Sequence, residues 1–144
     1  MKKITILFLL GLFLVQSILS QDFASQTSTL NIKKTSEKII LDGILNEMAW
    51  KQSDSAYNFT QNFPSDTSLA IAQTVVYIRY DDQNIYVGAK LYNAPGSRKY
   101  VTTSLRRDFR GEGNDSFSVI FDPFQDKTNG TIFGMNPFGV RREG

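Results

Sequence analysis

Two runs of β-branched and aromatic residues, separated by a short polar segment, constrain the fold of this chain more than any other feature. Thr74–Tyr80 (TVVYIRY) and Ile85–Tyr92 (IYVGAKLY) each place apolar side chains at alternate positions. Asp81–Asn84 (DDQN), between them, has the composition of a turn. The pattern predicts an antiparallel β-hairpin with a four-residue loop.

A second hairpin is predicted over residues 116–135. Phe117, Val119 and Phe121 recur at every second position, and Thr131–Met135 forms the returning strand. Asp126–Gly130 (DKTNG) supplies the turn between the two strands. Shorter strands are expected at residues 39–41 and 101–105, whereas the polar residues 21–35 form a lead-in without a clear period.

The end of the sequence resembles the approach to a further strand. The last predicted strand ends at Asn136, and Phe138–Gly144 follows it. An unpaired edge strand is prone to aggregate, so we expect the domain to continue beyond Gly144 and to be truncated here.

One short helix is expected after the Asp42-Gly43 turn, ending before Asp54. Asn46 is a favourable N-cap residue, and Leu45 and Trp50 then have the spacing of a hydrophobic staple. This places Trp50 in the core. Many short strands with one short helix predict an all-β domain, a β-sandwich, over residues 36–144.

The first twenty residues have the pattern of a secretory signal peptide. Lys2 and Lys3 precede the apolar run Ile4–Val15. This run is shorter than the roughly 20 apolar residues that a helix needs to span a bilayer. We expect cleavage after Ser20, with cleavage after Ser17 and an uncleaved anchor as the alternatives. The protein is therefore expected to be exported, and extracellular, periplasmic or associated with the outer membrane.

Composition excludes several classes of chemistry. The chain contains no His and no Cys, which rules out disulfides, thiolate sites, a Ser-His-Asp triad and nearly all catalytic zinc sites. Without Lys2 and Lys3, fourteen of the sixteen basic residues remain, equal to the fourteen acidic ones. A neutral mature chain gives no reason to expect a nucleic-acid partner.

Charged side chains between and after the hairpins supply two candidate sites. The acidic residues could act as turn residues, as calcium ligands or, as a third alternative, as a glycosidase pair. The basic residues could bind phosphate, an acidic sugar or a partner's carboxylates, or could form a solvated loop. The acids are Asp108, Glu112, Asp115, Asp122 and Asp126, and the bases are Arg98, Lys99, Arg106, Arg107 and Arg110.

Tyrosines supply a third candidate site. Tyr86 and Tyr92 share one strand face with Gly88 and Lys90. Such a face can be exposed and bind the apolar side of a sugar, or it can be packed under a loop. Both alternatives are open from the sequence. The other aromatic residues of this candidate set are Trp50, Tyr57, Tyr77 and Tyr100.

Three ordered segments resemble carbohydrate-binding module family 9 and its relatives. They are Ile40–Trp50 (ILDGILNEMAW), Val76–Gly88 (VYIRYDDQNIYVG) and Asn114–Phe124 (NDSFSVIFDPF), the last followed by Asn136–Val140 (NPFGV). The last segments are most similar to a branch at the front of large secreted bacterial proteins with a later outer-membrane β-region.

The resemblance implies a jelly-roll β-sandwich that binds a polysaccharide or oligosaccharide end without catalysis, beside a glycoside hydrolase. It requires no cofactor, with structural calcium in some members. Family members clamp the sugar between two aromatic residues, and the first clamp position falls near Glu112. Together with the strand face and the charged residues above, we expect sugar contacts at Tyr86, Tyr92, Arg107, Phe109 and Glu112, and calcium ligands at Asp115, Asp122 and Asp126. The alternative function is an interaction or plug domain of an outer-membrane protein.

Overall fold

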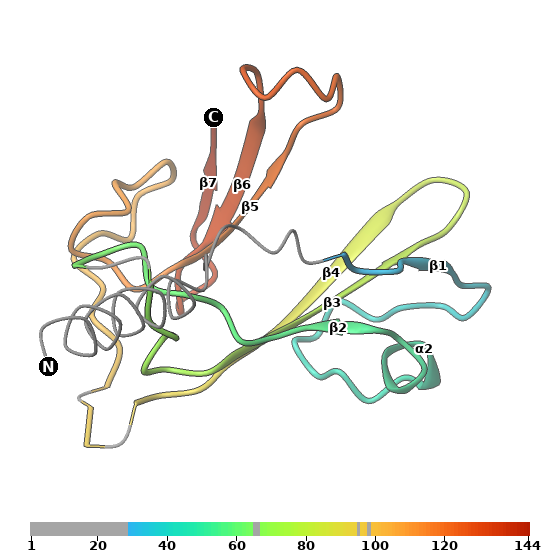
Figure 1. Ribbon diagram of the computed structural model, residues 1–144, viewed down its shortest axis with the longest axis horizontal. Coiled ribbons are helices and arrows are strands. Elements are labelled where there is room, and N and C mark those ends of the chain that lie inside the picture. The colour runs from blue at the N-terminus through green and yellow to red at the C-terminus, as the bar shows by residue number, and fades with distance from the viewer. Residues whose placement is uncertain (1–28, 65–66, 95, 98) are drawn as a thin grey trace, which may run out of the picture. The chain divides into compact units, whose positions relative to one another are not determined.

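The computed structural model describes residues 29–64, 67–94, 96–97 and 99–144 (Figure 1). The predicted signal peptide, residues 1–20, lies outside these ranges. The chain divides into two compact units, Met1–Tyr92 and Asn93–Gly144. The described residues form two β-sheets and a single four-residue α-helix, which confirms the all-β class.

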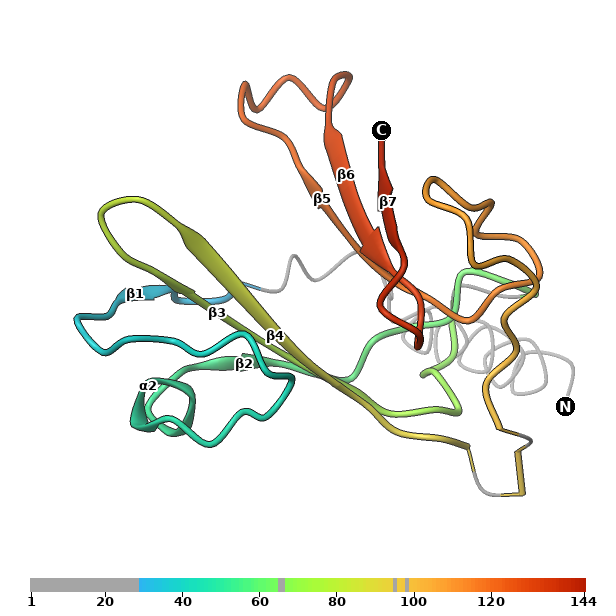
Figure 2. The same cartoon turned by 180° about the vertical axis from the view of Figure 1, so that it is seen from behind.

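The sheet of the first unit is built around the predicted hairpin. Strand β3 (Thr74–Tyr80) pairs with β4 (Ile85–Leu91) along its whole length, so the hairpin and its four-residue loop are confirmed. β1 (Lys33–Lys34) and β2 (Ser55–Ala56) both pair with β3 along the edge opposite to β4, β1 in parallel and β2 antiparallel. Figure 2 shows this sheet from behind.

Two strand expectations in this unit are wrong. β1 lies inside the stretch that was expected to be a lead-in. Ile39–Leu41, expected as a strand, forms none. The Ile40 N–H instead donates to Glu47 Oε1 at 2.9 Å, and the Ile39 side chain is buried in the core.

The helix is shorter than expected and is capped differently. α2 (Met48–Lys51) has Glu47, not Asn46, at its N-cap position, and Glu47 makes no side-chain cap. The Glu37 carboxylate caps the helix from a distance, accepting the N–H groups of Met48 at 3.3 Å and Ala49 at 2.7 Å. A carboxylate is favourable there because the first helical N–H groups lack intrahelical acceptors.

Trp50 lies in the core, as predicted, with only 4% of its surface exposed. It clusters with Ile39 and Ala49, and Leu45, Tyr77 and Tyr86 pack against this cluster. The tightest point of this packing is Gly88 of β4. A Cβ atom there would lie 3.0 Å from Leu45 and 3.3 Å from Trp50, so glycine lets the helix segment approach the strand.

A buried arginine ties the helix to the sheet. Arg79 of β3 is 4% exposed, and its Nε–H donates to Ala49 O at 2.8 Å and to Ser53 Oγ at 2.7 Å. These acceptors lie in and just after α2, where terminal carbonyl groups need donors.

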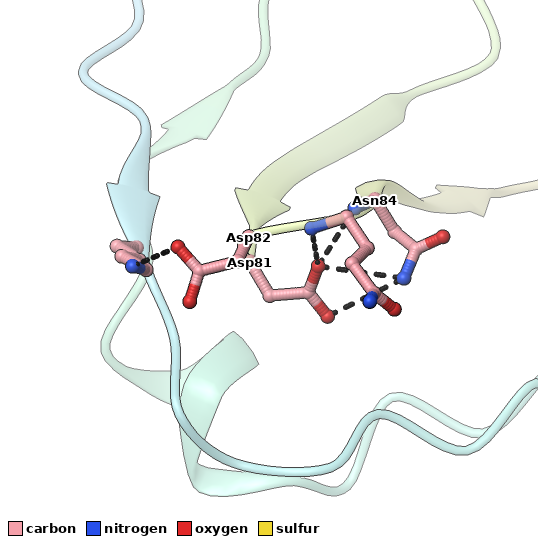
Figure 3. Close-up of polar contacts among 5 residues, drawn as sticks. Asp81, Asp82 and Asn84 are labelled. Carbon is pink, nitrogen blue, oxygen red and sulfur yellow. Dashed lines mark hydrogen bonds and ion pairs between the residues drawn. The ribbon is translucent and has the colours of Figure 1, made fainter.

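The β3–β4 turn is organised by Asp81 (Figure 3). One of its carboxylate oxygens accepts the N–H groups of Gln83 and Asn84, both at 2.7 Å. The other accepts the Tyr86 hydroxyl at 2.7 Å. Next to it, Asp82 forms an ion pair with Lys34 of β1. The Tyr86 hydroxyl, followed by the Gln83 N–H, lowers the pKa of Asp81 from 3.8 to about 2.

We predict that Tyr86→Phe raises the pKa of Asp81, because the variant loses the hydroxyl that donates to the carboxylate. A carboxyl with a depressed folded pKa stabilises the fold above its unfolded pKa of about 3.9. This stabilisation is lost in the wild type as the pH falls toward about 2. The measurement is a carboxyl ¹³C NMR titration of Asp81, with Tyr92→Phe as the control. An unchanged Asp81 pKa in Tyr86→Phe would contradict this assignment.

The sheet of the second unit is antiparallel. β5 (Phe117–Phe121) pairs with β6 (Thr131–Met135), which confirms the second hairpin. β6 also pairs with β7 (Arg141–Glu143), a strand within the stretch Phe138–Gly144 that resembled the approach to a further strand.

The strand expected at residues 101–105 is also absent, because side chains bind its backbone. Val101 N–H donates to Asp115 Oδ2 at 2.6 Å, and Thr103 N–H donates to Asn114 Oδ1 at 2.6 Å. These bonds take the place of a strand ladder.

Candidate functional site

Two exposed aromatic rings of the second unit meet edge to face. Tyr100 and Phe138 have ring centroids 6.4 Å apart at an interplanar angle of 89°. Tyr100 is 54% exposed and Phe138 is 63% exposed. We call these two residues the aromatic pair. Rings in contact with each other and with solvent offer apolar surface to a ligand at a fixed mutual angle.

Asn136 holds the segment that carries Phe138. This side chain is only 4% exposed, and its Oδ1 accepts the N–H groups of Phe138 at 3.0 Å and Val140 at 3.1 Å. Its Nδ2 donates to Ser104 O at 3.2 Å. The turn closes with Gly139 at φ +76°, a conformation that favours glycine. Asn136 therefore links the Phe138 turn to the segment that follows Tyr100.

Asn114 and Asp115 hold the segment next to Tyr100. Asp115 and Val101 exchange two hydrogen bonds, from Val101 N–H to the carboxylate and from Asp115 N–H to Val101 O at 2.7 Å. Asn114 Oδ1 also accepts the Thr103 hydroxyl at 3.1 Å, and its Nδ2 donates to Arg110 O at 2.8 Å. Side-chain bonds on both sides of the aromatic pair reduce the ordering that a ligand would have to induce.

The predicted calcium ligands are occupied by local hydrogen bonds. Asp115 binds Val101 as described, and Asp122 accepts Lys127 N–H at 2.9 Å. Asp126 accepts Asn129 N–H at 2.8 Å, and this bond and the Asn129 side chain lower the pKa of Asp126. These hydrogen bonds are those of ordinary turn residues, the first of the three alternatives for these acids. Across the described ranges, no three His, Cys, Asp or Glu side chains are grouped to hold a metal ion.

The predicted sugar contacts fall in both units of the chain. Tyr86 packs against the Trp50 cluster, and Tyr92, at the end of β4, is 53% exposed; both belong to the first unit. In the second unit Phe109 is 4% exposed, which leaves little ring surface for stacking. Arg107 pairs with Glu143 at 2.6 Å, and Glu112 is exposed. Two of these five residues therefore belong to the first unit and three to the second.

Sequence reasoning considered Tyr100 without assigning it, and it missed Phe138. The signal for Phe138 was present in the segment Asn136–Val140 (NPFGV), where an Asn precedes an aromatic residue and a glycine. Such an Asn can bind backbone N–H groups two residues ahead and fix a turn. The sequence could therefore have indicated Phe138 as a candidate binding residue at such a turn.

Among the residues that the structure describes, no helix is both long enough and apolar enough to cross a bilayer. Comparisons of the chain with protein-family models, with curated proteins and with solved structures find no significant match.

Proposed function

We propose that this chain is a non-catalytic carbohydrate-binding domain of an exported protein, and that the aromatic pair contacts the sugar. The observation that carries the proposal is the exposure of both rings, 54% for Tyr100 and 63% for Phe138, in a fixed edge-to-face contact. Pyranose rings have apolar C–H faces, which aromatic rings bind well when the ring is held in place.

The surroundings of the aromatic pair support binding rather than catalysis. The neighbouring carboxylate, Asp115, accepts Val101 N–H at 2.6 Å and so acts on the backbone. A glycosidase needs two free carboxyl groups, one of them with a raised pKa to serve as the acid. Hydrogen bonds instead lower the pKa values of four acids of the described chain, Glu47, Asp54, Asp81 and Asp126.

We further propose that the two sheets are the layers of a jelly-roll β-sandwich. Each sheet has an apolar face, because residues paired directly across strands share a face. Ile78 pairs with Val87 in the first sheet, and Val119 pairs with Phe133 in the second. Nuclear Overhauser contacts between the two faces would support this packing, and their absence in a fully assigned spectrum would contradict it.

We predict that Tyr100→Ala weakens binding of a xylo-oligosaccharide about tenfold, since an aromatic contact of about 1.5 kcal/mol is lost. Isothermal titration calorimetry with short xylan and cellulose oligomers measures the affinity. The same panel serves for Phe138→Ala, for which we expect a loss of similar size.

The matched control is Tyr92→Ala, which removes a tyrosine of nearly equal exposure, 53% against 54% for Tyr100. We expect this variant to bind like the wild type. If Tyr92→Ala weakened binding and Tyr100→Ala did not, the sugar contacts would lie on β4, as the sequence suggested. If the wild type bound no oligomer of the panel, the proposed function would be wrong.

A further inference from the structure

Arg142 of β7 carries a guanidinium group without a partner. The residue is partly buried, and its side chain forms no hydrogen bond and no ion pair in the part of the chain that the structure describes. A guanidinium has five N–H donors, and burial removes part of the water that would otherwise satisfy them. A side chain in this state is prepared to bind an anion.

The position of this guanidinium is defined by two glycines. Arg142 pairs with Gly134 of β6, which has no side chain to cover it. Its terminal Nη1 lies beside Gly111, where a Cβ atom would come within 2.9 Å of it. The guanidinium therefore lies against the backbone of the loop that contains Arg110 and Glu112.

The nearby acids that could have neutralised Arg142 are largely engaged elsewhere. Glu143 binds Arg107 at 2.6 Å, and Asp108 lies 3.6 Å from the same guanidinium. Asp108 Oδ1 also accepts Glu143 N–H at 3.0 Å. Glu112, the acid next to Gly111, forms no ion pair with any described residue.

Two further arginines lie next to these residues in the sequence. Arg110 precedes Gly111, and Arg141 precedes Arg142 on β7, where its carbonyl accepts Asp108 N–H at 3.0 Å. Neither guanidinium forms an ion pair within the described ranges. Arg141 and Arg142 lie on β7, within the stretch Phe138–Gly144 that resembled the approach to a further strand.

We infer that the sugar bound by this domain is acidic and that Arg142 binds the carboxylate of a uronic acid residue. This inference rests on the proposed function and extends it to a class of ligand. Phe138 and Arg142 are four residues apart, a length of chain that reaches at most about 14 Å. One short oligosaccharide can therefore contact both the aromatic pair and the guanidinium, and the planar fork of arginine matches a carboxylate with two parallel hydrogen bonds.

The test compares three oligosaccharides of equal length by calorimetry with the full chain. They are a neutral xylo-oligosaccharide, the same oligomer bearing one glucuronic acid, and the methyl ester of that acidic oligomer. We expect the acidic oligomer to bind about tenfold tighter than the other two. The methyl ester keeps the shape of the uronate and removes its charge, so it isolates the role of the anion.

Arg142→Gln should remove the preference for the acidic oligomer and leave the affinity for the neutral one unchanged. Arg142→Lys keeps the charge but loses the fork, so it should retain part of the preference. Lys127→Gln, which removes one positive charge from the β5–β6 turn, is the matched control and should behave like the wild type. Unfolding curves of each variant show whether the fold is retained.

The possible failures are distinguishable. Equal affinity for the acidic oligomer and its methyl ester, or an intact preference in folded Arg142→Gln, would overturn the acidic-sugar inference and leave carbohydrate binding standing. A loss of preference in Lys127→Gln equal to that in Arg142→Gln would show a diffuse charge effect and would also overturn it. No binding of any oligomer would reject both the inference and the proposed function.

Discussion

Replacing Trp50 with alanine is expected to lower the free energy of unfolding by about 3–5 kcal/mol. Trp50 is 4% exposed and touches both the helix segment and the sheet. Its ring meets that of Tyr77 edge to face, with the ring centroids 6.5 Å apart. The buried cluster around it is small, with Ile39 and Ala49 as its other members. Neighbours this few cannot close the cavity that a missing indole would leave.

Urea unfolding followed by circular dichroism measures this loss, because the variant has no tryptophan left for fluorescence. The control is Tyr57→Ala, which removes an aromatic side chain of the same unit that is 61% exposed. We expect that change to stay within about 0.5 kcal/mol. A loss below about 1 kcal/mol for Trp50→Ala would contradict the location of the core at this residue.

Replacing Asn136 with alanine is expected to lower the free energy of unfolding by about 2–3 kcal/mol. The substitution leaves the N–H groups of Phe138 and Val140 and the carbonyl of Ser104 without their partner. Each unsatisfied buried group costs about 1–3 kcal/mol, with partial compensation by water that enters the space. The same variant should also weaken oligosaccharide binding, because the turn that carries Phe138 loses its support.

Asn136→Asp separates the two functions of this side chain. The aspartate keeps an oxygen that can accept the two N–H groups, but it cannot donate to Ser104 O, which accepts Nδ2 at 3.2 Å in the wild type. We expect a loss of stability between those of the wild type and the alanine variant, measured by the same urea unfolding. If Asn136→Ala were as stable as the wild type and bound sugar normally, Asn136 would have no part in holding the aromatic pair.

Short-range pattern was sufficient for the hairpins. β3 and β4 alternate in side-chain character, and a polar four-residue turn joins them, so pairing partners lie close in sequence. The same holds for β5 and β6. Trp50 is buried against Leu45 as expected, but not through the staple positions counted from Asn46, because the helix begins one residue later with Glu47 as its N-cap.

Long-range contacts were not predictable in the same way. β1 pairs with β3 across 39 intervening residues, and two lysines carry no apolar pattern that indicates a strand. The α2 cap depends on Glu37, eleven residues before Met48, whereas sequence rules for caps consider adjacent positions. In both cases the partner is selected by the tertiary fold rather than by local preference.

The candidate site could not be predicted from local patterns either, because its residues lie far apart in the sequence. Tyr100 and Phe138 belong to separate segments, and only the side chain of Asn136, bonded to Ser104, reveals that these segments adjoin. Arg142 could not be singled out among the basic residues, because its isolation depends on which acids its neighbours bind. The sequence indicated that aromatic and basic residues could bind a ligand, and the structure is needed to show which of them lie together.

The central claim is that the aromatic pair binds a sugar, and an NMR titration tests it most directly. The ¹⁵N-labelled chain is titrated with a short xylo-oligosaccharide bearing one glucuronic acid, and backbone amide shifts are followed to saturation. The account predicts the largest shifts at residues 100–103 and 136–142, with little change in β3 and β4. Shifts centred on Tyr86 and Tyr92, or no saturable shift at any concentration, would contradict it.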